Sequence, residues 1–289
     1  MTLIVAYLDK DYAVIASDRR ITWNLGGARS QYEDVENKAL LLCGHLLVGY
    51  TGFARFDGLR TDEFIVRVLT GLPVSEYLAT IARITEQRIR NMRRLKVKQR
   101  GHAYLAVGFL NNLEDPEVLV PVAFSISNAL GPTGRWQPQN DFRVERYPLG
   151  DHPFLLRTVP PGHDELATKY RKWVAHYRKA RPGRMRGILD LMVRLIREAA
   201  STNDAISPDV SVAVLPKVAV GSGEFGVGLV REPIVEVSAF SLVQSEGDVV
   251  SMYGPATVCP AFASYGAETH FGASADQFGR PRPSAGPPP

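Results

Sequence analysis

The sequence predicts an α+β protein in which helices pack in layers on antiparallel sheets. Short β-type runs alternate in blocks with pairs of helices, in the order strands, two helices, strands, two helices, strands. This grouping lacks the strict strand–helix alternation of a parallel α/β fold. The 289 residues, 45% of them hydrophobic, suffice for one large domain with a sizeable core.

The chain opens with two short apolar runs, residues 3–8 and 12–17. They are separated by Asp9-Lys10-Asp11, a turn composition, so we predict a hairpin. Both runs are apolar almost throughout, which indicates burial on both faces. Asp18-Arg19-Arg20 ends the second strand, and we expect a polar loop to continue to about Asn37.

The later elements follow from apolar periodicity and from Gly and Pro breaks. Further strands are expected at residues 39–42, 45–50, 103–109, 118–124, 142–147, 210–215 and 234–237. Helices are expected at residues 61–69, 75–92, 164–179 and 187–200, the first of them capped by Thr61 or Asp62. From about Gly272 to Pro289 the composition collapses to Gly, Ala, Ser, Pro and Arg, which predicts a disordered tail.

Composition excludes several classes of protein. No apolar run approaches the roughly 20 residues of a membrane span, and the N-terminus lacks a secretory signal pattern, so we expect a cytoplasmic protein. The two cysteines, Cys43 and Cys259, form no motif that predicts a disulfide framework or a zinc site. The six histidines show no ligand spacing. Neither a metal nor a cofactor is expected.

The net charge is +4, and the excess of basic residues is concentrated in two segments. Such clusters can bind nucleic acid through phosphate contacts, but they also form solvated helix faces or subunit contacts. We favour the second interpretation because no zinc spacing, RNP-type aromatic motif or recognition-helix pattern accompanies them. The clusters are Arg88, Arg90, Arg93, Arg94, Lys96, Lys98 and Arg100, and Lys169, Arg171, Lys172, Arg178, Lys179, Arg181, Arg184 and Arg186.

The first two residues, Met1 and Thr2, carry a chemical signal. Methionine aminopeptidases remove Met1 when the second residue is small, so we expect maturation by Met1 removal. This leaves a free α-amine beside the hydroxyl of Thr2. An α-amine with a pKa of roughly 8 can take the hydroxyl proton, which activates threonine as a nucleophile.

Five motifs in order resemble the proteasome β-type family of N-terminal-nucleophile hydrolases, which includes the bacterial two-ring protease HslV and the ancestral β-subunit group. They are Thr2, the strand end Ile15-Ala16-Ser17-Asp18-Arg19-Arg20-Ile21-Thr22, Lys38, Val48-Gly49-Tyr50-Thr51-Gly52, and Asn203-Asp204-Ala205-Ile206-Ser207. The sixteen positions from Thr2 to Asp18 and the fourteen from Lys38 to Gly52 match the family, whereas the loop between Thr22 and Lys38 is longer. The resemblance covers roughly residues 2–237.

The resemblance implies a role for each motif residue. Thr2 Oγ would attack the scissile carbonyl, with its own α-amine as general base. Lys38 would place positive charge where the alkoxide develops, and Asp18 would orient it. The Gly52 N–H would form the oxyanion hole. The remaining two, Asp204 and Ser207, would hydrogen-bond around the Thr2 amine.

The resemblance also implies a substrate cleft. An extended peptide would add as a strand, with Ile21, Thr22, Tyr50 and Ala54 along its walls and Tyr50 narrowing the first pocket. Arg20 would brace this region. One departure concerns the Gly-Ser-Gly turn that the family carries near the nucleophile's amine. The nearest segment here is Leu149-Gly150-Asp151-His152, in which Asp151 is the candidate to replace the serine's hydrogen bond.

At the level of architecture, the resemblance implies a four-layer αββα sandwich. We expect one domain over residues 2–240, a C-terminal extension over 241–271 and the tail over 272–289. The family acts as rings or stacked assemblies, so a homo-oligomer acting on peptides or unfolded proteins is expected, and the sequence does not reveal whether an ATPase is a partner. Two alternatives remain: an amidohydrolase acting on a small amide, and a catalytically silent scaffold that binds nucleic acid through its basic helices.

Overall fold

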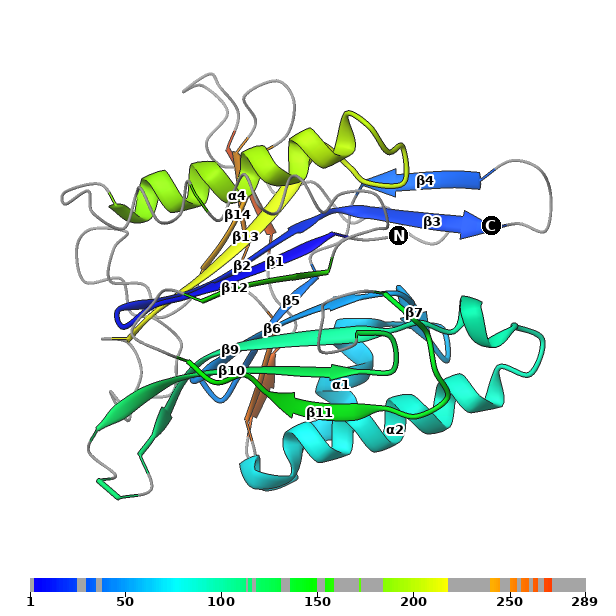
Figure 1. The fold of residues 1–289 in the computed structure, drawn as a ribbon, viewed down its shortest axis with the longest axis horizontal. Helices are drawn as coiled ribbons and strands as arrows, with labels where there is room; N and C mark the ends of the chain where they lie inside the picture. Colours follow the sequence, from blue (N-terminus) through cyan, green and yellow to red (C-terminus); the bar gives the residue numbers. More distant parts are fainter. Residues whose placement is uncertain are drawn as a thin grey trace.

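The computed structural model describes a mixed α+β fold, as the sequence predicts (Figure 1). Two seven-stranded sheets form its centre. For residues 22–24, 30–34, 154–158, 184–186 and those from 240 onward, the description covers the backbone alone. The described residues are 3–24, 30–34, 38–112, 114–115, 118–130, 136–149, 154–158, 172, 184–217, 240–244, 250–253, 256–259, 262–264 and 268–271.

Sheet one is antiparallel, with the strand order β12-β1-β2-β13-β14-β15-β18. The predicted N-terminal hairpin is confirmed, and the Asp9 carboxylate closes its turn by accepting the N–H groups of Asp11 and Tyr12. Its strands are β1 (Ile4–Leu8), β2 (Tyr12–Asp18), β12 (Phe154–Thr158), β13 (Val210–Pro216), β14 (Phe240–Gln244), β15 (Val250–Tyr253) and β18 (Glu268–Phe271).

Sheet two has the strand order β11-β10-β9-β6-β5-β16-β17. All of its pairs are antiparallel except β16 with β5, where Ala256 lies opposite Leu40. Its strands are β5 (Ala39–Leu42), β6 (Leu46–Thr51), β9 (Ala103–Asn111), β10 (Leu119–Ser127), β11 (Arg143–Arg146), β16 (Ala256–Cys259) and β17 (Phe262–Ser264).

Two small hairpins extend from the sheets. β3 (Arg20–Asn24) pairs with β4 (Ser30–Asp34), where the sequence predicted a polar loop. The β-branched and aromatic residues of Ile21-Thr22-Trp23 favour an extended chain, which the Gly residues and charges nearby obscured. β7 (Arg55–Phe56) pairs with β8 (Leu59–Arg60) through Asp57 and Gly58, which both have the positive φ of a tight hairpin turn.

The helices cover the outer faces of the two sheets (Figure 1). α1 (Thr61–Leu69) and α2 (Tyr77–Asn91) pack on sheet two, and the short 3₁₀ turn Val74–Glu76 leads into α2. Another 3₁₀ turn, Val97–Gln99, precedes β9. α4 (Arg184–Ala200) packs on sheet one and begins three residues before the predicted position. No helix among the described residues is long and apolar enough to cross a membrane.

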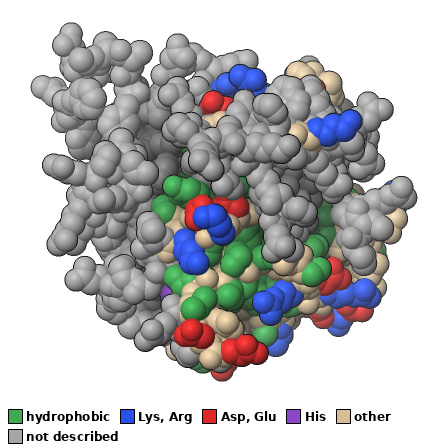
Figure 2. Space-filling model, turned by 60° about the vertical axis from the view of Figure 1, so that its left-hand side comes forward, with side chains coloured by type: hydrophobic (Ala, Val, Ile, Leu, Met, Phe, Trp, Pro, Cys, Tyr) green, Lys and Arg blue, Asp and Glu red, His purple; other side chains and the backbone are tan. Residues whose placement is uncertain are grey.

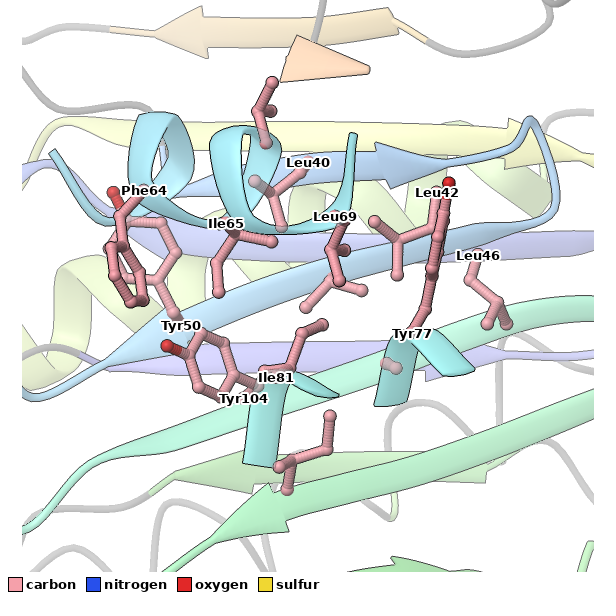
Figure 3. Close-up of a cluster of buried hydrophobic side chains, with 14 of the residues drawn as sticks. Leu40, Leu42, Leu46, Tyr50, Phe64, Ile65, Leu69, Tyr77, Ile81 and Tyr104 are labelled. Carbon is pink, nitrogen blue, oxygen red and sulfur yellow. The ribbon is translucent and has the colours of Figure 1, made fainter. Parts of the chain in front are cut away.

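Three hydrophobic clusters fill the spaces between these elements. The start of the chain is an example: Leu3 and the β1 residues Val5 and Tyr7 face the α4 side, whereas Ile4, Ala6 and Leu8 of β1 face the other sheet. Burial on both faces is therefore confirmed, and it arises because side chains alternate along a strand. Figure 3 shows the cluster between sheet two and its helices.

Several predicted segments lie outside the described residues. They are the strand 234–237, the tail 272–289 and the helix 164–179 except for Lys172. Of the five described strands between Phe240 and Phe271, β14 pairs with β13 and β16 pairs with β5, so this part of the chain lies directly beside strands near the candidate site.

Candidate active site

Asp18 ends β2 and fixes the backbone at the start of the chain. Its Oδ1 accepts the N–H of Leu3 at 2.7 Å, and its own N–H donates to the Leu3 carbonyl at 3.3 Å. The carboxylate has no exposed surface. Asp18 therefore holds the residue that immediately follows Thr2. Thr2 itself lies outside the described residues.

Lys38 joins Asp18 across the two sheets. Its Nζ lies 3.3 Å from Asp18 Oδ2 and donates to the Arg20 carbonyl at 2.8 Å. The Lys38 side chain is 2% exposed. Because desolvating two charges is costly, a buried pair of this kind persists only where further hydrogen bonds satisfy it. Here the Asp18 carboxylate also accepts the N–H groups of Leu3 and Arg20.

Arg20 connects this ion pair to the loop before β13. Its guanidinium donates to the backbone carbonyls of Asp204 and Ile206. The Asp204 side chain is exposed, whereas Ser207 is fully buried and accepts the N–H of Asp209. The Asp209 carbonyl in turn accepts the Arg19 N–H. The structure therefore brings the Asp204–Ser207 segment against the end of β2 through backbone contacts.

Gly52 lies in the turn that follows β6, on the side where β5 begins. Lys38 and Tyr50 are joined through the Tyr50 N–H and the Lys38 carbonyl, so Gly52 is two residues, about 7 Å, farther along the strand direction. Gly52 has φ +112° and is exposed. A Cβ there would lie 2.5 Å from the Gly101 carbonyl and 2.8 Å from His102 Nδ1, so only glycine fits.

The Gly52 turn rests on two anchors. The Phe53 N–H donates to His102 Nδ1 at 3.0 Å, and the Phe53 carbonyl accepts the Thr61 hydroxyl at 2.8 Å. The Ala54 carbonyl accepts the Thr61 N–H. No sequence motif marks His102 for this contact, because it lies 49 positions from Phe53. Only the pairing of β6 with β9 brings the two together.

The predicted substrate-wall residues have different environments. Ile21 is 3% exposed and Ala54 is half-buried. Tyr50 is 1% exposed, and its ring lies beside Phe64 and Tyr104 in the cluster under the helices (Figure 3), which differs from the expected position on a pocket wall. The reason is register: alternate side chains of β6 face the helices, and position 50 is one of these. The Thr22 side chain and Asp151 lie outside the described residues.

His102 is a fully buried, neutral imidazole. Tyr50, Phe53, Phe56 and Tyr104 surround its ring, with the Tyr104 ring centroid 4.6 Å away in an edge arrangement. Burial among these rings lowers the pKa of His102 to about 3. Since Nδ1 accepts the Phe53 N–H, the ring proton is assigned to Nε2.

Because of His102, the free energy of unfolding is expected to fall as the solution becomes more acidic. Its pKa is about 3 in the folded protein and 6.5 when solvated, so its contribution is fully present above pH 6.5 and is lost as the pH falls toward 3. Between pH 6.5 and about pH 5 this amounts to about 2 kcal/mol of unfolding free energy. Urea unfolding of the native protein and of His102→Asn at several pH values measures it. Equal pH slopes for the two proteins would contradict the assignment.

The basic segment around α2 is partly neutralised. Arg88 lies 3.1 Å from Asp57, and Arg90 contacts both Glu86 and Asp141. On the face that Figure 2 shows, Lys and Arg side chains of the described residues are interspersed with Asp and Glu. Of the second basic cluster, only the side chain of Lys172 is described, and it is exposed. Among the described residues no group of His, Cys, Asp and Glu side chains is arranged to hold a metal ion.

Comparison with known proteins gives matches among solved structures. Two Anbu structures resemble this chain. Anbu (ancestral beta-subunit) from Yersinia bercovieri has 15% identity and a TM-score of 0.46, and the match covers 74% of this chain and 81% of that one. The Anbu (Gly-1) mutant from Hyphomicrobium sp. strain MC1 has 12% identity and a TM-score of 0.44, over 75% of this chain and 82% of that one.

No protein-family model and no curated protein matches the chain.

Proposed function

We propose that the protein is a threonine-type peptidase whose nucleophile is the Thr2 hydroxyl, exposed with its α-amine once Met1 has been removed. The observation that carries the proposal is the buried Lys38–Asp18 pair, in which Asp18 also binds the N–H of Leu3. Burying the Lys38 cation beside the backbone that leads into Thr2 is costly for folding. A cation in this place can stabilise the negative charge that develops on a nucleophilic oxygen.

The proposed reaction has two steps. The Thr2 Oγ adds to the scissile carbonyl carbon while its proton passes to the α-amine, and the Gly52 N–H donates to the resulting oxyanion. The C–N bond then breaks, and the ammonium returns the proton to the leaving amine, which leaves an ester on Thr2. Water then adds to the ester carbonyl as it gives a proton to the α-amine, and the ester C–O bond breaks while the ammonium returns that proton to Thr2 Oγ, which releases the acid and restores the hydroxyl and the free amine.

The surrounding residues receive supporting roles. We assign Lys38 to stabilising the developing alkoxide and Asp18 to orienting Lys38. Arg20 braces the loop through the Asp204 and Ile206 carbonyls, and this contact supports a role for the loop near the Thr2 amine. Ser207 and Asp204 are proposed to tune that amine. Asp151 is proposed to supply the hydrogen bond of the family's serine.

At the level of architecture we propose the four-layer αββα sandwich of N-terminal-nucleophile hydrolases. The packing of α1 and α2 on sheet two and of α4 on sheet one supports it. We propose a homo-oligomeric ring or stacked assembly with an extended peptide, or an unfolded chain, as substrate. The proposed substrate walls are Ile21, Thr22 and Ala54, because the Tyr50 ring packs in the core.

The test is intact-protein mass spectrometry with and without a threonine-directed electrophile, a β-lactone or a peptide epoxyketone. We expect a chain that lacks Met1 and gains one adduct, and no adduct for Thr2→Ala at an unchanged unfolding midpoint. Retained Met1 and no adduct would contradict the proposal, and salt-sensitive retention of DNA or RNA by that material would favour the nucleic-acid-binding alternative. Turnover of small amides but not peptides would favour an amidohydrolase with the same nucleophile.

A further inference from the structure

We propose that His102 is a positioning residue for the reaction above: its Nδ1 accepts the Phe53 N–H and fixes the Gly52–Phe53 peptide, which holds the Gly52 backbone in the conformation that lets its own N–H donate to the substrate carbonyl. The inference rests on the proposed function, since it concerns the same oxyanion hole. His102 itself touches neither substrate nor nucleophile in this proposal. It acts through the backbone of the Gly52 turn.

The contact between the turn and His102 is unusually close. A Cβ on Gly52 would lie 2.8 Å from His102 Nδ1 and 2.9 Å from its Cα, so the Gly52 backbone packs directly against the histidine. The next peptide then turns its N–H onto Nδ1 at 3.0 Å. Because a peptide unit is planar, fixing the Phe53 N–H also fixes the Gly52 carbonyl, and with it the rotation of Gly52 about Cα–C.

The histidine is itself held in place by its own backbone. The His102 N–H donates to Asn128 Oδ1 at 2.8 Å, and the His102 carbonyl accepts the Ser127 hydroxyl at 3.0 Å. Asn128 Nδ2 in turn donates to the carbonyls of Arg100 and Gln139, each at 3.0 Å. The His102 backbone therefore belongs to a hydrogen-bonded network at the β9–β10 end of sheet two, which is the kind of support that a precise site requires.

The His102 imidazole is suited to be a permanent hydrogen-bond acceptor at Nδ1. Nδ1 can accept a hydrogen bond only while it carries no proton, and burial among Tyr50, Phe53, Phe56 and Tyr104 holds the pKa of His102 well below neutrality. Nε2 has no hydrogen-bond partner among the described residues, and the rings of Phe56 and Tyr104 pack against the imidazole in T-shaped arrangements. Packing among these rings does not by itself require a hydrogen-bond acceptor, whereas the Phe53 N–H does.

Two polar substitutions of His102 test whether the hydrogen-bond acceptor must lie at the place of Nδ1 or whether any polar side chain suffices. The amide of His102→Asn reaches the place of Nδ1 and can accept the Phe53 N–H, whereas the amide of His102→Gln reaches the place of Nε2 and leaves that N–H without its acceptor. Tyr104→Phe is the control for damage to the same cluster, because it removes only the 3.0 Å hydrogen bond between Tyr104 and Thr85. Urea unfolding establishes that each variant is folded under the assay conditions.

Two electrophiles distinguish a defect in the oxyanion hole from a defect in the nucleophile. Acylation by a β-lactone develops negative charge on a carbonyl oxygen, whereas addition to a peptide vinyl sulfone develops charge on carbon. Labelling rates for both are measured by intact mass. We expect His102→Gln to lower the ratio of the β-lactone rate to the vinyl-sulfone rate about 10- to 100-fold, which is the scale of a misplaced catalytic group. His102→Asn is expected to restore most of the ratio, and Tyr104→Phe to leave it unchanged.

The outcomes distinguish this inference from the proposed function. If the native protein reacts with both probes and the rate ratio is the same in His102→Gln as in His102→Asn, the inference is overturned while the nucleophile stands. If the native protein reacts with neither probe, the proposed function fails first. Nitrogen NMR of histidine-labelled native protein is a check that needs no variant: a proton on Nε2 is expected, and a proton on Nδ1 would overturn the inference.

Discussion

Lys38→Met is expected to abolish electrophile labelling at Thr2 and to lower the free energy of unfolding by about 3–5 kcal/mol. The loss of stability follows because Asp18, with no exposed surface, would keep a carboxylate without its cation. The loss of labelling follows because the methionine side chain carries no charge to stabilise the Thr2 alkoxide. Urea unfolding and intact mass measure the two effects on the same preparation.

The double variant Asp18→Asn with Lys38→Met is the control. Both side chains are then neutral, and Asn Oδ1 can still accept the Leu3 N–H although its Nδ2 cannot accept the Arg20 N–H, so part of the lost stability should return while labelling stays absent. This result would separate the electrostatic role of Lys38 from its contribution to folding. Labelling of Lys38→Met at the native rate would remove lysine from the proposed mechanism.

Gly52→Ala is expected to destabilise the protein by about 2–5 kcal/mol and to suppress β-lactone labelling. Two costs add: the left-handed φ of +112°, and the overlap of the new Cβ with the Gly101 carbonyl at 2.5 Å and His102 Nδ1 at 2.8 Å. Relief of the overlap moves the turn away from β9, and the Gly52 N–H moves with it. Urea unfolding and the labelling rate give the two readings.

Gly71→Ala is the matched control, because Gly71 has a similar φ of +83° and a Cβ there would meet nothing within 4 Å. We expect it to cost only the backbone strain, about 1–3 kcal/mol, and to leave labelling intact. The difference between the two variants isolates the contact of the Gly52 turn with Gly101 and His102. Equal costs for the two variants would show that this contact is unimportant.

The strands and helices with strong apolar patterns could be predicted from the sequence. The hairpin of residues 3–17 and the helix ending at Ala200 carry their periodicity in their own residues, and both are found. The hairpin β3–β4 was mistaken for a loop because the glycines and charges between its strands outweighed the short β-type run at Ile21. The Asp18–Lys38 contact was expected only from the resemblance, and the structure brings the two side chains together.

Other features of the site depend on strand register, which the local pattern of residues in the sequence does not specify. Tyr50 was expected on a pocket wall, yet the alternation along β6 turns its ring toward the helices. His102 contacts the Gly52 turn only because β6 pairs with β9, and no motif marks a histidine for this role. The parallel pairing of β16 with β5 likewise joins segments that are far apart in the chain.

The pairing of β2 with β13 has a consequence for synthesis of the protein. Asp18 lies opposite Val210, so the strand that carries it gains its second neighbour only after residues 210–216 have left the ribosome. The edge of β5 beside Lys38 is covered later still, by residues 256–258. Such long sequence separations slow folding, because a large loop must close before the contacts form. With Thr2 as the nucleophile, the nascent chain would thus stay inert until residues 210–216 and 256–258 have been synthesised and paired with β2 and β5.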